Sequence, residues 1–131
     1  MYATPPTLAD FKVLFQERLA QNYPPPEAQA IFRRTAEHIL KMEAYQIPLR
    51  LREPLLPAEA DELQTALDRL AAGEPLQYVL GETVFCGFPF KVNPSVLIPR
   101  PETEELANWI VESCTHAGQK VMDIGVGSGC L

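Results

Sequence analysis

The chain has 131 residues, of which 47% are hydrophobic and 21% charged, with a formal net charge of −6 and a pI near 4.9. This composition is too apolar for a disordered chain, and the length suits one average domain or a small domain with part of a second. The acidity argues against direct binding to nucleic acid or to an anionic membrane as the main activity, because both call for a basic surface.

The cysteines and the N-terminal segment further limit the classes of protein to which the chain can belong. Three cysteines, Cys86, Cys114 and Cys130, and two histidines form neither a disulfide framework nor a zinc site by their spacing. The N-terminus lacks the basic start and apolar core of a signal peptide, and no apolar run approaches the ~18 residues that cross a bilayer. We therefore expect reduced thiols, no bound metal, no membrane partner and a cytoplasmic location.

Three amphipathic helices are predicted in the first half of the chain. The first spans residues 7–21, where Thr7 is a plausible N-cap and Asp10 completes a capping box. The second follows the segment "YPPPE", and the third opens at Pro57 and ends near Gly73. The positions expected to face the core are Leu8, Phe11, Phe15, Leu19, Ala28, Ile31, Phe32, Thr35, Ala36, Ile39, Leu40, Leu63, Leu67 and Leu70. Residues 1–73 are thus expected to form a helical domain.

The remaining residues change character. "TVFCGFPFKV" predicts two short strands, Thr83–Phe85 and Phe90–Val92, around a turn that contains Gly87. "VLIP" is an apolar segment, predicted as a strand, and it leads into a helix with acidic residues in its first turn. "KVMDI" is predicted to be a buried strand. The expected fold class is α+β: a helical bundle, a β-hairpin linker over 74–94, and the start of an α/β domain over 95–131.

A glycine-rich loop follows the last predicted strand. "DIGVGSG" places Gly125, Gly127 and Gly129 at alternate positions after Asp123. Glycines let a backbone turn tightly and let a nucleotide-like ligand approach without a Cβ in the way. By spacing alone the pattern is weak, since an ordinary glycine-rich turn fits it too. The candidate cofactor residues in this loop are Asp123, Gly125, Val126, Gly127, Ser128 and Gly129.

A second candidate feature is the bend "VLIPRPETE". Pro99 and Pro101 flank Arg100, and two prolines stiffen the connection and fix the direction in which the next residues project. A rigid bend of this kind suits a wall against a ligand, although most such turns only connect elements.

Three blocks give the sequence a specific resemblance. "GEPLQYVLGETVFCGFPFKV", "VLIPRPETEEL" and "VMDIGVGSGC", in this order and spacing, resemble the bacterial release-factor glutamine methyltransferases, the HemK/PrmC family. The preceding helices are similar to that family only in length and pattern. A sister group that methylates a ribosomal-protein glutamine usually differs at "PRPETE", so the intact Pro99–Glu104 segment favours the release-factor branch.

The resemblance implies an activity and a fold. It implies methyl transfer from S-adenosylmethionine to the glutamine side-chain amide in the Gly-Gly-Gln motif of class I peptide chain release factors. It further implies a Rossmann-like methyltransferase domain, a substrate-recognition role for residues 1–73, and cofactor contacts from Arg100, Pro101 and Glu102 as well as from the glycine loop.

One family segment has no counterpart in this sequence. The family orients the glutamine amide with an Asn-Pro-Pro-Tyr segment, whereas the single Asn-Pro here, Asn93-Pro94, precedes the glycine loop and continues with Ser95. The resemblance therefore implies no catalytic residue among these 131. We expect the chain to be a portion of a longer enzyme and to be inactive alone.

Other readings remain open from the residues themselves. One such reading is that the helical domain is a binding module that recognises a release factor and does no chemistry. The glycine loop alone would also fit an unrelated nucleotide- or NAD-linked domain. A nucleic-acid methyltransferase of the same fold is disfavoured by the acidic charge and by the "PRPETE" block.

Overall fold

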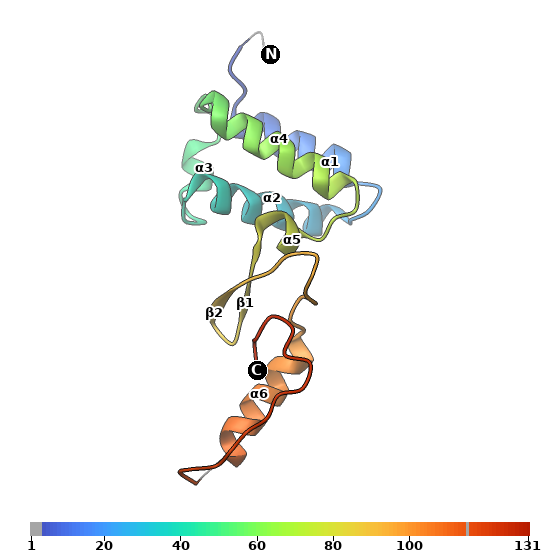
Figure 1. Ribbon diagram of the computed structural model, residues 1–131. Helices are drawn as coiled ribbons and strands as arrows, with labels where there is room; N and C mark the ends of the chain where they lie inside the picture. Colours follow the sequence, from blue (N-terminus) through green and yellow to red (C-terminus); the bar gives the residue numbers. More distant parts are fainter. Residues whose placement is uncertain (1–3, 115) are drawn as a thin grey trace. The chain divides into compact units, whose positions relative to one another are not determined.

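A computed structural model describes residues 4–114 and 116–131. The chain divides into two units, one ending at Leu80 and the other running from Gly81 to Leu131 (Figure 1). The first unit holds the helices α1 (Leu8–Leu19), α2 (Pro25–Leu40), α3 (Ile47–Arg50), α4 (Pro57–Ala71) and α5 (Leu76–Leu80). The second holds the strands β1 (Glu82–Phe85) and β2 (Phe88–Lys91) and the helix α6 (Pro101–Ser113).

The ends of the three long helices follow from local sequence. The N–H of Asp10 donates to the Thr7 hydroxyl oxygen at 3.3 Å, and the N–H of Thr7 donates to the Asp10 carboxylate at 2.8 Å, which confirms the predicted capping box of α1. Proline occupies the first turn of α2 and of α4, where its missing N–H costs no hydrogen bond. Directly after the last residues of α4, Gly73 has a φ of +90°, as expected for a glycine that stops a helix.

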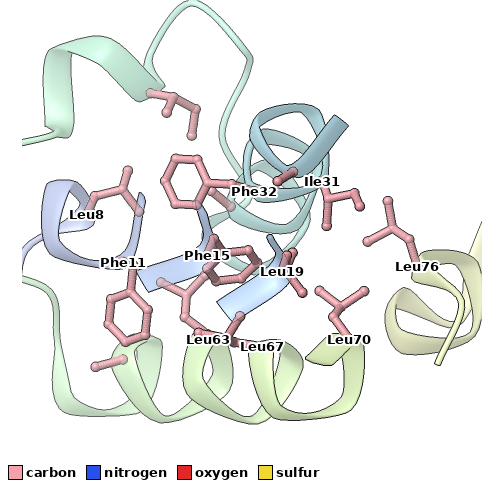
Figure 2. Close-up of a cluster of buried hydrophobic side chains, with 14 of the residues drawn as sticks. Leu8, Phe11, Phe15, Leu19, Ile31, Phe32, Leu63, Leu67, Leu70 and Leu76 are labelled. Carbon is pink, nitrogen blue, oxygen red and sulfur yellow. The ribbon is translucent and has the colours of Figure 1, made fainter. Parts of the chain in front are cut away.

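The core of the first unit lies where α1, α2 and α4 pack against one another (Figure 2). The apolar periodicity predicted most of its members. Ile39 and Leu40, however, are only partly buried. The buried residues that it did not predict are Ile47, Leu55, Ala60 and Leu76. Phe15 and Phe32 meet edge to face with ring centroids 5.4 Å apart, and the buried Thr35 hydroxyl donates to the Ile31 carbonyl at 2.8 Å. The fully buried side chains of this core include Leu8, Phe11, Phe15, Leu19, Leu63, Leu67 and Leu70.

Two short helices extend the first unit beyond the predicted elements. Neither α3 nor α5 is among the elements predicted from the sequence. The guanidinium of Arg69, in α4, donates to the Glu74 carboxylate at 2.6 Å and to the carbonyl oxygens of Tyr78 and Val79 at 3.1 and 3.2 Å. These hydrogen bonds hold α5 against α4, and Leu76 is buried in the same core. The unit therefore ends at Leu80, later than residue 73.

The hairpin of the second unit confirms the predicted pair of strands. β1 and β2 are antiparallel, with Phe85 opposite Phe88, so the turn consists of two residues, Cys86 and Gly87. Their φ values are +48° and +81°, the two positive values that a type I′ turn requires. β2 starts at Phe88, earlier in the chain than the predicted strand at Phe90.

Two other predicted strands are wrong for the described chain. Residues 96–99 and 120–124 have no strand geometry, and the side chains of Val121, Met122 and Ile124 are 74%, 83% and 88% exposed. A strand needs a neighbour that takes up its backbone hydrogen bonds, and the sheet found among the described residues contains β1 and β2 alone. The observed fold is thus a helical domain followed by a small two-stranded sheet and one further helix.

Candidate functional site

The proline bend and the glycine loop line the same pocket in the second unit. The pocket has a volume of about 160 Å³. Its wall from the bend consists of Leu97, Ile98, Pro99, Arg100 and Thr103. Its wall from the loop includes Asp123, Gly125, Val126, Gly127, Ser128 and Cys130. Two segments singled out separately in the sequence are therefore brought together.

Most of the predicted cofactor residues line this pocket, but not all. Arg100, Asp123 and the run from Gly125 to Ser128 do so. Pro101, Glu102 and Gly129 are absent from its lining, although each is adjacent in sequence to a lining residue or to Arg100. Thr103 and Cys130 also line the pocket and were not predicted from the sequence. The signal that could have identified them is their position in the chain, close to the bend and to the glycine loop.

The glycines of the loop are required by backbone conformation. Gly125, Gly127 and Gly129 have φ values of +82°, +57° and +76°, in the left-handed region that side-chain-bearing residues rarely adopt. A Cβ at Gly125 would meet nothing within 4 Å, and at Gly127 and Gly129 the nearest atoms lie at 3.8 and 3.9 Å. There is therefore room for a side chain at these positions. Glycine is favoured because of the left-handed backbone conformation, which determines the course of the loop. The N–H of Gly129 donates to the Val126 carbonyl at 2.9 Å and closes a turn.

The bend owes its geometry to the start of α6. Arg100 is the N-cap residue, with φ −102° and ψ 151°, and Pro101 takes the first helical position. The N–H of Thr103 donates to the Arg100 carbonyl at 3.0 Å. A proline at the first helical position fixes φ near the helical value, while the residue before it stays extended. Arg100 is consequently held at the edge of the pocket by backbone constraints.

An acidic residue of the same block ties the hairpin turn to α6. The Glu104 carboxylate accepts a hydrogen bond of 2.8 Å from the N–H of Cys86. Although Cys86 is exposed, partial desolvation of its thiol, followed by the charge of Glu104 and a smaller effect of Cys130, raises its pKa. This contact was not predicted, since nothing local in the sequence connects a turn with a helix that starts fifteen or so residues later.

The pocket fits part of a nucleoside-sized ligand. Ligand cavities typically measure about 300–1,000 Å³, so 160 Å³ encloses one portion of such a molecule. The Asp123 carboxylate can accept hydrogen bonds from ammonium or hydroxyl groups, and the Arg100 guanidinium can donate to carboxylate or carbonyl oxygens. In the described part of the chain, no group of three His, Cys, Asp or Glu side chains is placed to hold a metal ion. Among the described helices, none is long and apolar enough to cross a membrane.

Comparison with known proteins identifies a family. Residues 13–81 match the family described as the PrmC N-terminal domain, a range that covers most of the first unit and ends at the start of the second. Similar curated proteins carry the name release factor glutamine methyltransferase. That of Flavobacterium psychrophilum is 34% identical over 128 residues, which cover 95% of this chain and 45% of the relative. That of Bacteroides thetaiotaomicron is 39% identical over 116 residues, covering 88% and 41%.

A third relative has a higher identity over a shorter alignment. The release factor glutamine methyltransferase of Geobacter sulfurreducens is 48% identical over 79 residues, covering 60% of this chain and 28% of the relative. The chain spans less than half the length of each of these three relatives.

Proposed function

This chain belongs to the PrmC family, and on that premise we propose that it forms part of an enzyme that methylates a glutamine side-chain amide. The acceptor is the glutamine of the Gly-Gly-Gln motif in class I peptide chain release factors, and the donor is S-adenosylmethionine. The observation that supports this proposal most strongly is the similarity over 95% of the chain to a release factor glutamine methyltransferase. An alignment that covers 95% of the chain includes most of the helical unit and the whole of the bend, whichever end it leaves out.

The residues of the pocket suit the binding half of this reaction. S-adenosylmethionine, when bound, supplies a methyl group on a sulfonium that is activated for transfer. Gly125 and Gly127 line the pocket without a Cβ, so a nucleoside can approach the loop backbone closely. The Asp123 carboxylate accepts hydrogen bonds from the hydroxyl or ammonium groups of the ligand. The bend from Leu97 to Arg100 forms the other wall and limits how the ligand can move.

The units would then divide the work. We assign recognition of the release factor to the helical residues 1–73, a linking role to the hairpin segment 74–94, and the start of a Rossmann-like S-adenosylmethionine domain to residues 95–131. The chain alone is expected to transfer no methyl group, because its sequence lacks the Asn-Pro-Pro-Tyr segment with which the family orients the glutamine amide. The number and spacing of the cysteines favour reduced thiols, and we propose a cytoplasmic location.

The second candidate function is a binding module. The helical unit has its own packed core, whereas α6 buries no side chain. A chain of this kind can recognise a release factor while contributing nothing to catalysis. In that case the chain would bind the release factor with the same affinity whether or not S-adenosylmethionine is present.

A chimaera tests the enzymatic proposal. Residues 1–131 would be continued by the remaining residues of the Flavobacterium psychrophilum relative, and the chimaera incubated with a class I release factor and S-adenosylmethionine. Mass spectrometry of the Gly-Gly-Gln peptide should show a gain of one methyl group on the glutamine. The unaltered relative is the positive control, and the 131-residue chain alone is expected to give no gain.

The outcomes separate the two functions. Methylation by the chimaera supports the enzymatic proposal. A folded chimaera, checked by circular dichroism, that binds the release factor without methylating it favours the binding module. Methylation by the 131-residue chain alone would contradict the claim that the catalytic residues lie outside it.

A further inference from the structure

The helical unit carries an apolar groove on the side of α2 that meets α1 and α3. The groove has a volume of about 380 Å³, within the usual range of about 300–1,000 Å³ for ligand sites. Phe32, Ile47 and Leu51 supply apolar lining, and the first two are only 2% and 5% exposed. Because these side chains also belong to or pack against the core, the apolar surface of the groove is held in place by the fold.

The charges at this groove are of one sign. Lys12 from α1 and Arg33 from α2 line it, and no Asp or Glu is among its described lining residues. Acidic residues outnumber basic ones by 17 to 11 over the whole chain, so a groove with two cations differs from the average surface. The Arg33 Nε lies 3.6 Å from a Glu37 carboxylate oxygen, with the Arg33 side chain 58% exposed. An exposed pair of this length is weak, and the guanidinium can turn to another carboxylate.

The apolar surface continues beyond the groove along the chain. Tyr45 and Leu49 are adjacent in sequence to the lining residues Ala44 and Pro48, and their side chains are 71% and 78% exposed. A small ligand would be accommodated by the groove itself. Neighbouring exposed aromatic and aliphatic side chains are instead typical of a surface that covers a polypeptide.

We propose that this groove docks an acidic segment of the protein substrate, with an apolar side chain in the groove and carboxylates beside Lys12 and Arg33. The identity of that substrate as a class I release factor rests on the proposed function. That the segment is acidic and carries an apolar side chain is inferred from the residues that line the groove. Charges at the edge of such a site mainly raise the association rate and select the partner, so binding should weaken as salt concentration rises.

Binding measurements on the 131-residue chain test this docking. The probe is a purified class I release factor, titrated by calorimetry at low and at high salt. The double variant Lys12→Glu/Arg33→Glu should weaken binding by about tenfold and reduce its salt dependence, because it replaces two attractions with repulsions. Ala30→Leu leaves both charges in place and fills the groove with a residue that helices accept, and it should also weaken binding.

Arg34→Glu is the matched control. Arg34 neighbours Arg33 on the same helix and is exposed, but it does not line the groove. This variant changes the net charge by the same amount as Arg33→Glu, and it should bind within about twofold of the wild-type chain if position rather than total charge matters. Thermal unfolding of every variant shows whether the helical unit stays folded.

Three results would overturn the docking proposal. The first is a wild-type chain that does not bind the release factor. The second is equal weakening by Arg33→Glu and Arg34→Glu, and the third is no weakening by Ala30→Leu. None of them depends on methyl transfer, so methylation by the chimaera with an unaffected groove variant would reject the docking site and leave the proposed function standing.

Discussion

In the helical unit the apolar faces of the long helices are buried, whereas in the second unit the apolar face of α6 is exposed. In the helical unit, the side chains of Leu8, Phe11 and Phe15 are fully buried between α1, α2 and α4. In the unit from Gly81, α6 is also amphipathic, yet none of its residues is buried and Trp109 is 68% exposed. Periodicity tells which face of a helix is apolar, and burial further requires a surface to cover that face. The described residues supply such a surface for the long helices of the first unit but not for α6, although Phe85 and Val92 of the second unit are buried.

The largest difference that we expect is between substitutions of a buried and of an exposed aromatic side chain. Phe15→Ala removes a fully buried ring and should lower the free energy of unfolding by about 3–5 kcal/mol. Trp109→Ala removes a side chain of similar size from an exposed position and should change it by less than about 0.5 kcal/mol. Urea unfolding followed by far-UV circular dichroism measures both. Similar losses for the two variants would show that α6 is packed in solution.

The next contrast lies within the second unit, between glycines that share a left-handed backbone. Gly127 lines the pocket with φ +57°, whereas Gly118 has φ +84° outside it. An alanine at either position costs about 1–2 kcal/mol of local strain. In the chimaera, Gly127→Ala should weaken binding of S-adenosylmethionine by about tenfold, and Gly118→Ala should leave it almost unchanged. Calorimetric titration with S-adenosylmethionine measures both affinities. Equal losses of affinity in the two variants would show that the glycine loop is not part of the binding site.

Acid should act on the helical unit through three carboxylates. Hydrogen bonds from Thr7 lower the pKa of Asp10, the Arg18 side chain lowers that of Asp68, and the Arg69 side chain lowers that of Glu74. A carboxyl whose pKa is lower in the folded state stabilises the fold above its unfolded pKa, and the stabilisation disappears as pH falls through the folded value. The stability of the helical unit should therefore be level near neutrality and fall below about pH 4.

The variant Asp68→Asn checks the source of this acid effect. It removes the carboxylate that lies 2.5 Å from Arg18, so its stability should depend less on pH in the acid range than that of the wild-type chain. Urea midpoints between neutral and acid pH give the comparison. A wild-type chain whose stability rises on acidification would contradict the assignment.

The smallest expected effect concerns the hairpin turn. Cys86 has a φ of +48°, a conformation that asparagine tolerates better than cysteine, and Asn-Gly is the preferred pair for a type I′ turn. Cys86→Asn should stabilise the hairpin by a few tenths of a kcal/mol, up to about 1. Cross-strand contacts between residues facing each other in β1 and β2, measured by NMR, should strengthen. Weaker contacts would show that the cysteine side chain itself supports the turn.

Local signals in the sequence predicted the helical unit well. The Thr7–Asp10 capping box, the proline starts and the apolar stripes of α1, α2 and α4 all depend on residues close together in the chain. α3 and α5, with four and five residues, are too short to show helical periodicity. The hydrogen bonds that Arg69 donates to Tyr78 and Val79 hold α5 in place. The strand expected over residues 120–124 failed because a strand is defined by a neighbour, which no local pattern reports.

The candidate site was predicted as two separate segments. Glycine spacing indicated a ligand loop and the paired prolines indicated a rigid wall, but their convergence on one pocket is a tertiary fact. The resemblance of the whole block order to a methyltransferase family was what connected them. The hydrogen bond from Cys86 to Glu104 had no such signal, since it joins a turn to a distant helix.

Hydrogen exchange measured by mass spectrometry on the 131-residue chain tests the contrast between the units most directly. The account predicts strong protection in peptides from α1, α2 and α4, and almost none in residues 120–131, where the N–H of Gly129 makes the backbone hydrogen bond described above. Strong protection over residues 120–131 would contradict the account, because the glycine loop would then be held by structure that the described contacts do not contain.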